Sequence, residues 1–380
     1  MVQGPLSGVR VVELCGWHTG PMAATILGDQ GADVIKVESP GGDEYRRGGT
    51  RRGGFSASFM AANRNKRSIT LDLKQPSHAA ALRKLISVAD VFIQNQRPGV
   101  VERLGFGAAQ ICAELPRLIY VSISGYGRTG PKSGERAFDT MVQAMVGMAS
   151  VQRDADGRPH MMRTLLVDKT TSPIVAQAIC AALFQRGQTG KGCNIDYSML
   201  DAMVWWMWPD GMINDTFIGG GVEPGIAVAD ADFVCKTADG YMVVSPHQES
   251  AWHHFTKLIG KPELYLDPRF SPVSERMRNL KEYSYVVRTS LSSRTTDEWC
   301  RLFAENDIPY APVLTVGEVA KHPQVVWNGI VEEVDHPTAG KYRSPKGPVF
   351  FNNQRNGTWR QVPQAGEHSA EIMAEFGIML

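Results

Sequence analysis

The sequence predicts an α/β fold, with a Rossmann-like large domain and a smaller α+β domain. Apolar runs typical of strands alternate with helical patterns over residues 9–124, which indicates a parallel sheet covered by helices. A stretch rich in Gly, Pro and Asp, residues 209–231, then interrupts the chain as linkers do. We expect a large domain over residues 1–208 and 327–380, a linker or Gly-rich loop over 209–225, and a small domain over 226–326.

The elements of the large domain follow in a regular order. An apolar run, Val9–Leu14, precedes a Gly-containing loop, a helical pattern and a second run, Asp33–Glu38, which together make a β-α-β unit. Further runs typical of strands are Ser68–Leu73, Asp90–Asn95 and Leu118–Ser124. Ligands of such sheets bind beyond the carboxyl ends of the strands, so we expect a site at the loops after Leu14, Asn95 and Ser124.

The smaller domain begins with a hairpin pattern, in which two β-rich runs flank Ala-Asp-Gly at residues 238–240. Helical patterns follow over residues 249–319. The tail from residue 327 combines short strands with a helix over residues 366–377.

Composition excludes several classes of protein. The chain is 43% apolar and 21% charged, and its net charge of +1 argues against a nucleic-acid partner. The six cysteines are scattered, without the paired spacing of a disulfide framework or a zinc site, so no metal is expected. The start of the chain lacks the layout of a signal peptide, and no apolar run reaches about 18 residues. We therefore expect a cytoplasmic protein without a membrane partner.

Asp168 follows three apolar residues and precedes an apolar helical pattern. Ser172 is expected to cap that helix and Pro173 to lie in its first turn. Asp168 would then precede the helix, either as a turn residue that accepts backbone N–H groups or as a carboxylate nucleophile that the helix dipole keeps ionised. The residues alone favour the first interpretation.

A concentration of positive charge marks residues 46–103. A dinucleotide G-x-G-x-x-G motif and a P-loop are both absent, so neither standard nucleotide site is predicted. The cluster is either a solvated basic face or a phosphate cradle, since Arg forks match phosphate oxygens. Its members are Arg46, Arg47, Arg51, Arg52, Arg64, Lys66, Arg67, Arg97 and Arg103.

The chain resembles the family III CoA-transferases of the formyl-CoA and carnitine CoA-transferase type. An ordered set of segments carries the resemblance over nearly the whole chain, and the set is far more specific than any one segment. It includes PLSGVRVVEL, MAATILGDQGADVIKVESPGGD, NRNKRSITLDLK, RPGVVERLGFG, SISGYGRTGP, RAFDTMVQAMVGM, TGKGCNIDYSMLDAM, IPYAPVLTVGEV and PQAGEHSAEIMAEFG.

The resemblance implies that Asp168 is the catalytic carboxylate. It would attack a donor thioester to give an acyl-aspartyl anhydride, and the released CoA thiolate would convert this to aspartyl-CoA. The acceptor carboxylate would then attack aspartyl-CoA, and CoA would return to form the new acyl-CoA. Such covalent catalysis divides one difficult exchange into easier steps. No metal ion or permanently bound cofactor is implied, since coenzyme A and acyl-CoA enter as substrates.

The resemblance also implies contacts with CoA. Those at the front of the chain are His18 and Thr19 in the first loop and Lys36, a basic residue that would face the adenosine phosphates. The others are Leu71, Asp72, Leu73, Lys74, Asn95, Gln96, Arg97, Arg103, Arg136 and Asp139. Gln96 replaces the family's usual aromatic residue, which brings stacking at that position into question. The basic cluster would meet the 3′-phosphate and pyrophosphate of CoA.

Two alternatives remain open. The α-methylacyl-CoA racemases share the resemblance, but they pair the matching Asp with a His where this chain has Phe138. A phenyl ring cannot carry a proton, so racemisation would need His18 or His160 as a substitute base. The second alternative is a CoA-binding protein without catalytic activity.

Two further features concern assembly. Ile218–Gly225 is either a mobile Gly-rich loop over the site or a plain linker. Family members form interlocked homodimers of ring-shaped chains, and the resemblance implies the same here. The expected partners are thus acyl-CoA, a carboxylic acid and a second copy of the chain.

Overall fold

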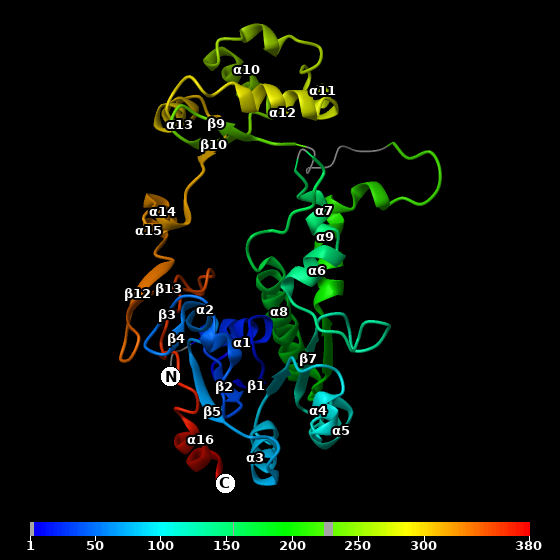
Figure 1. Cartoon of the computed structure of the whole chain (residues 1–380), viewed down its shortest axis with the longest axis vertical. Coiled ribbons are helices and arrows are strands. Elements are labelled where there is room, and N and C mark those ends of the chain that lie inside the picture. Colours follow the sequence, from blue (N-terminus) through cyan, green and yellow to red (C-terminus); the bar gives the residue numbers. More distant parts are fainter. Residues whose placement is uncertain (1–3, 155, 224–230) are drawn as a thin grey trace. The chain divides into compact units, whose positions relative to one another are not determined.

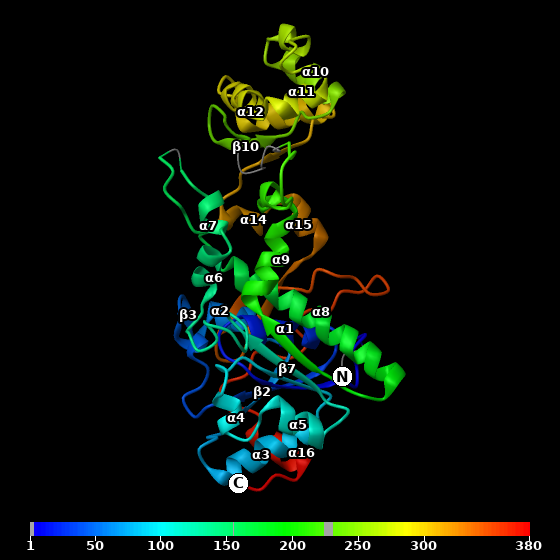
Figure 2. The same ribbon diagram turned by 90° about the vertical axis from the view of Figure 1, so that its right-hand side faces the viewer.

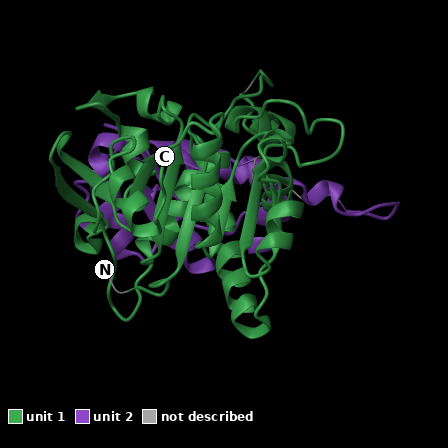
Figure 3. Ribbon diagram, turned by 90° about the horizontal axis from the view of Figure 1, so that it is seen from below, with its two compact units in different colours: residues 1–206, 324–380 green, residues 207–323 purple. Residues whose placement is uncertain are grey.

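A computed structural model describes residues 4–154, 156–223 and 231–380 (Figure 1). The chain divides into two compact units, residues 1–206 with 324–380 and residues 207–323 (Figure 3). Residues 209–223, expected as a linker, group with the second unit. Pro224 and Gly225, the end of the expected Gly-rich loop, lie outside the described residues.

A sheet of six parallel strands forms the centre of the first unit, in the order β5-β2-β1-β6-β7-β8. Its strands are β1 (Arg10–Leu14), β2 (Asp33–Glu38), β5 (Lys66–Thr70), β6 (Val91–Gln94), β7 (Ile119–Ser124) and β8 (Asn194–Ser198). The prediction of a parallel α/β sheet is confirmed. The third strand begins and ends earlier than its expected range, because Leu71–Leu73 already belongs to the loop that follows it.

Helices cover both faces of this sheet because successive strand residues point to opposite sides. Val11 packs with α1 (Thr19–Asp29) and α8 (Leu166–Thr189), which lie side by side in Figure 2. Val12 faces the other way. The helices on that face are α3 (Pro76–Ser87), α4 (Val100–Arg103), α5 (Ala108–Glu114) and α16 (Ser369–Phe376).

Shorter elements complete the first unit and lead out of it. They are η1 (Glu44–Arg47), β3 (Arg51–Arg52), β4 (Phe55–Ser56), α2 (Ala57–Ala61), α6 (Asp139–Met145), α7 (Met148–Val151), α9 (Met199–Gly211), α15 (Pro323–Asn328), β12 (Val331–His336) and β13 (Gly340–Pro345). The last two strands pair as an antiparallel ribbon, as expected for the tail.

The helix after Asp168 begins earlier than the sequence predicts. It starts at Leu166, so Asp168 lies inside its first turn and Pro173 lies in its interior. Ser172 does not cap the helix; its hydroxyl donates instead to the Asp168 carbonyl at 2.6 Å. The prediction relied on Ser followed by Pro, which is a common signal for the start of a helix. It was wrong because the helix already begins six residues before Ser172.

The second unit contains a three-stranded antiparallel sheet and several helices around an aromatic core that includes Trp252 and Trp299. Its strands are β9 (Val234–Lys236), β10 (Tyr241–Val244) and β11 (Tyr310–Pro312). Its helices are η2 (Ile213–Asp215), α10 (Glu249–Leu258), η4 (Pro262–Tyr265), α11 (Val273–Arg278), α12 (Leu280–Thr289), α13 (Thr296–Glu305) and α14 (Val316–Val319). The predicted hairpin is the antiparallel pair β9–β10. Within the described ranges, no helix is both long and apolar enough to span a bilayer.

Candidate active site

A cavity of about 950 Å³ lies at the carboxyl ends of the parallel strands. Residues that follow five different strands line it, among them Gly16, Ser39, Leu71, Asn95 and Gly125. Strand β1 is flanked by β2 on one side and β6 on the other, so the strand order reverses here. Ligands of open α/β sheets bind at such reversal points. The cavity therefore lies where we expected a site, at the loops after Leu14, Asn95 and Ser124.

Three helices begin beside this cavity, and each contributes a side chain. Thr19 is the first residue of α1, Asp139 the first of α6, and Asp168 the third of α8. The Thr19 hydroxyl donates to Asp168 Oδ1 at 2.5 Å, and the Asp168 backbone N–H donates to Asp139 Oδ2 at 3.0 Å. Helix N-termini favour negative charge, so their convergence suits a carboxylate and the oxyanions that form near it.

The Asp168 carboxyl group is mostly withdrawn from water. Burial raises its pKa to about 6, although the Thr19 hydrogen bond acts in the opposite direction; the negative charge of Asp139 adds to the increase. Burial is the largest of these influences on the pKa of Asp168. At pH 7 the group is still ionised in about nine molecules of ten, as a pKa one unit below the pH requires.

The geometry removes the helix-capping interpretation of Asp168. Asp168 lies within the helix and not ahead of it, its carboxylate accepts from Thr19, and Asp139 is the acceptor for its N–H. Asp139 is itself held by Gln143, whose amide donates to Asp139 Oδ1 at 2.5 Å and accepts from the N–H of Met162 at 3.0 Å. The Asp168 carboxylate is thus left with Thr19 as its side-chain partner and faces the cavity.

Most of the residues predicted for the site line this one cavity. They are His18, Thr19, Leu71, Asp72, Leu73, Lys74, Asn95, Gln96, Arg97, Arg136, Asp139 and Asp168. Lys36 and Arg103 do not. Lys36 is fully buried and its Nζ lies 2.9 Å from Asp43 Oδ2, so the prediction that it faces the phosphates was wrong. Arg103 is exposed at the end of α4, next to the cavity residue Leu104, but is not itself part of the lining.

A family model described as CoA-transferase family III matches residues 6–369. The chain belongs to CoA-transferase family III.

Named relatives agree with that assignment. The succinyl-CoA:glutarate CoA-transferase of Mus musculus is 34% identical over 98% of this chain and 86% of its own length. The acetyl-CoA:oxalate CoA-transferase of Acetobacter aceti is 33% identical over 98% and 96%. A crystal structure of a CAIB/BAIF family protein from Brucella suis has a TM-score of 0.84 at 30% identity, over 99% of this chain and all of the other. The protein is therefore a CoA-transferase.

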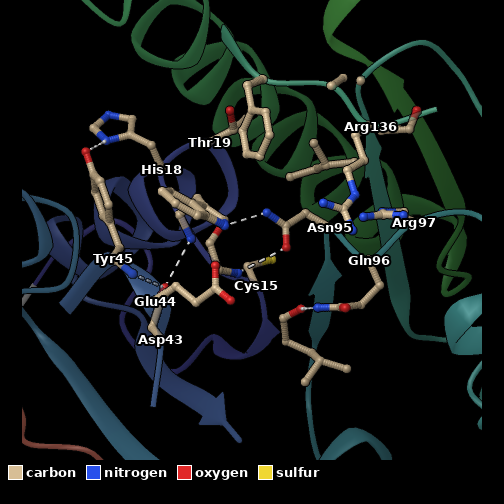
Figure 4. Close-up of a pocket in the computed structure, with 18 of the residues that line it drawn as sticks. Cys15, His18, Thr19, Asp43, Glu44, Tyr45, Asn95, Gln96, Arg97 and Arg136 are labelled. Carbon is tan, nitrogen blue, oxygen red and sulfur yellow. Dashed lines mark hydrogen bonds between the residues drawn. The ribbon is translucent and has the colours of Figure 1, made fainter. Parts of the chain in front are cut away.

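The positive charge of this CoA-transferase is divided between two locations. Lys74, Arg97 and Arg136 are exposed at the cavity, and their side chains make no ion pair or hydrogen bond within the described part of the chain. Figure 4 shows Arg97 and Arg136 in the cavity. Much of the basic cluster does not line the cavity. The prediction that the whole cluster meets the phosphates of CoA is corrected accordingly. Its buried members form ion pairs and do not line the cavity: Arg64 with Asp29 at 2.5 Å, Lys66 with Glu13 at 2.8 Å, and Arg67 with Asp33 at 2.6 Å.

Three residues bear on the racemase alternative, and two of them, His18 and Phe138, line the cavity. Phe138 precedes Asp139 at the cavity and packs edge-on against Trp17, with ring centroids 5.7 Å apart. His160 is half-exposed, pairs with an aspartate and does not line the cavity. Burial and the charge of Lys169 lower the pKa of His18 to about 4, so its ring is neutral at pH 7. His160 is thus outside the lining, and His18, which is part of it, is a weak base because its pKa is low.

Sequence reasoning missed several residues of the cavity, among them Trp17, Asp43 and Tyr45. Asp43 accepts the backbone N–H groups of Trp17 at 3.3 Å and Tyr45 at 2.9 Å, which joins the loops after β1 and β2 (Figure 4). The Pro-Gly-Gly-Asp turn at residues 40–43 marks a loop in the sequence. Its contact with the first loop is visible only in the folded chain.

Proposed function

We propose that this protein transfers CoA from an acyl-CoA to a carboxylic acid, with Asp168 as the covalent nucleophile. The observation that carries the proposal is the position of the Asp168 carboxylate. It lies in the cavity where three helices begin and within 2.5 Å of a hydroxyl. The names of the family and of its relatives support the exchange of CoA between acids.

The reaction balances with no other group than the carboxylate. One oxygen of Asp168 attacks the thioester carbonyl, the C–S bond breaks, and CoA thiolate leaves an acyl-aspartyl anhydride. The thiolate then attacks the aspartyl carbonyl of that anhydride, which gives aspartyl-CoA and the donor acid. An acceptor carboxylate repeats these two steps in reverse, and Asp168 is regenerated when the thiolate attacks the acceptor's carbonyl. The helix N-termini favour the oxyanion of each step.

We assign the binding of CoA to basic residues that line the same cavity. Lys74, Arg97 and Arg136 line the cavity without an ion pair to any described residue, and their charges suit the phosphates of CoA. The backbone and side chains of Leu71–Leu73 suit the adenine. We further propose that the chains pair as interlocked homodimers in the cytoplasm.

The test is covalent capture. Wild-type protein incubated with an acyl-CoA alone is expected to gain the mass of CoA less one water, on Asp168. Asp168→Ala should show no adduct and no transfer, yet still bind CoA. Asp335→Ala is the matched control, since Asp335 is exposed on β12 and does not line the cavity. An adduct or substantial turnover in Asp168→Ala would refute the covalent role.

A second assay distinguishes the alternatives. Transfer from succinyl-CoA to a panel of carboxylic acids is followed by mass spectrometry of the CoA products. Exchange of the α-proton of a 2-methylacyl-CoA is followed in deuterated water. Transfer without exchange supports the proposal; exchange without transfer indicates a racemase. CoA binding with neither activity indicates a protein that only binds CoA.

A further inference from the structure

The loop between β1 and α1 is held by side chains at three successive residues. The Lys36 ammonium donates to the carbonyl of Cys15 at 2.9 Å. The amide of Asn95 accepts from the Gly16 N–H at 3.1 Å and donates to the Gly16 carbonyl at 2.8 Å. The Trp17 N–H donates to Asp43 Oδ1 at 3.3 Å. Figure 4 shows Asn95 and Asp43 contacting this loop from two sides.

Lys36 and Asp43 form a buried ion pair behind the loop, with Nζ and Oδ2 2.9 Å apart. Lys36 Nζ also lies 3.4 Å from Glu13 Oε1, which accepts from Lys66 at 2.8 Å. Burial disfavours the charge on Lys36, but the carboxylates of Glu13 and Asp43 outweigh it and raise its pKa above the usual value. Lys36 therefore stays charged, and each buried charge has an opposite partner.

This support matters because the loop is strained. Trp17 has a φ of 64°, in the left-handed region that residues other than glycine rarely adopt. Such a conformation persists only where the surroundings determine it. Two residues later Thr19 begins α1 and places its hydroxyl 2.5 Å from Asp168. The position of that hydroxyl depends on the loop before it.

We propose that Lys36 is a positioning residue of the transfer reaction, which through Asp43 and the Cys15 carbonyl fixes the loop that sets Thr19 against Asp168. The inference rests on the proposed function, because it takes Asp168 as the nucleophile. It assigns Lys36 a role other than phosphate binding. The side chain is fully buried, with Cys15 and the carboxylates around its ammonium group.

The test is a double-mutant cycle with Lys36→Met, Asp43→Ala and Thr19→Val. If Lys36 acts through Thr19, Lys36→Met should lower kcat at pH 7 about as much as Thr19→Val does. It should also move the acidic limb of the pH profile upward and leave the Kd for CoA within about twofold. Combining the two changes should add little, because contacts in one chain of interactions are not additive. Asp43→Ala should behave as Lys36→Met does.

The charged and titratable groups near Asp168, namely Asp139, His18, Tyr45 and Lys169, are unchanged in these variants. The position of the acidic limb of the pH profile therefore measures the pKa of Asp168 in each variant.

The control is Lys74→Met, which removes an exposed lysine from the cavity wall and should raise the Kd for CoA without moving the pH limb. The proposal is overturned if Lys36→Met gives this same pattern, or if its effect adds fully to that of Thr19→Val. Circular dichroism and thermal melting identify folded variants, and Asp43→Ala decides the matter if Lys36→Met does not fold. The proposed function fails by a different result. If Asp168→Ala still turns over, no covalent adduct on Asp168 is needed, and the proposed function is overturned instead.

Discussion

Thr19→Val removes the hydroxyl that donates to Asp168 at 2.5 Å while keeping the shape of the side chain. A hydrogen bond to a charged group contributes about 1.5–3 kcal/mol. Since 1.36 kcal/mol corresponds to one pKa unit, its loss should raise the pKa of Asp168 by about one to two units. The starting value is about 6, so the acidic limb of the pH profile should move to about pH 7 or 8.

The direction of the change in activity depends on which protonation state of Asp168 reacts. The ionised carboxylate is the nucleophile, so activity is lost as the pH falls through its pKa. At pH 7 the variant should lose about two- to tenfold in kcat/KM, which is the change in the ionised fraction for that shift. Near pH 9 the difference should largely disappear.

The assay is the rate of CoA transfer from pH 5 to 9, at subsaturating acyl-CoA. Thr19→Ser keeps the hydroxyl and should restore the wild-type limb. Thr140→Val is the isosteric control, because Thr140 also lines the cavity and, among the described residues, its hydroxyl donates to the sulfur of Met141 and not to Asp168. A loss in Thr19→Val that is equal at pH 6 and pH 9 would refute the reasoning.

Three other predictions follow from the same site. The pKa of Asp168 is raised on folding from 3.8, so its ionised form costs stability above pH 6 and nothing below pH 3.8. Asp168→Asn should therefore raise the free energy of unfolding, by up to about 3 kcal/mol at pH 7.5 and by less as the pH falls toward 4. Urea titrations at several pH values measure this difference. A Cβ on Gly125 would lie 2.0 Å from the Cβ of Ala137, so Gly125→Ala should lower both kcat and the melting temperature, whereas Gly134→Ala, which meets no atom within 4 Å, should change neither. Arg97→Gln should raise the Kd for CoA up to about fivefold at low salt, as measured by calorimetry, and less at about 1 M salt, because exposed charges are screened there.

The local order of the chain explains why the parallel sheet was predictable. Alternating apolar runs and helical patterns specify a sheet covered on both faces, and polar loops must then gather at its carboxyl edge. That argument located the cavity from Leu14, Asn95 and Ser124. The resemblance identified Asp168, and the residues alone had favoured a turn.

The start of α8 shows where local signals fail. Ser172 followed by Pro173 is a start signal, yet the helix already begins at Leu166. Asp139 at the start of α6 supplies the acceptor that the first turn of α8 requires. A capping group from another helix leaves no trace in the sequence near the helix it caps.

The number of basic residues could be read from the sequence, but the partner that each one has in the fold could not. Arg97 and Arg64 are both arginines in a basic stretch, but one is free at the cavity and the other pairs with Asp29 inside the fold. Lys36 was assigned to phosphate from its place at the end of a strand, and the structure buries it against Asp43. Which partner a charge meets depends on residues distant in the sequence.

The sequence by itself determined the sheet, the edge at which the cavity lies and, through the resemblance, the carboxylate at its centre. Patterns of apolar residues and ordered motifs are properties of the chain, so they can be read without coordinates. Only the tertiary structure decided the protonation and support of that carboxylate. Burial, the Thr19 hydroxyl and the Asp139 carboxylate act on Asp168 across more than twenty residues of chain, and their balance depends on distances that folding alone sets.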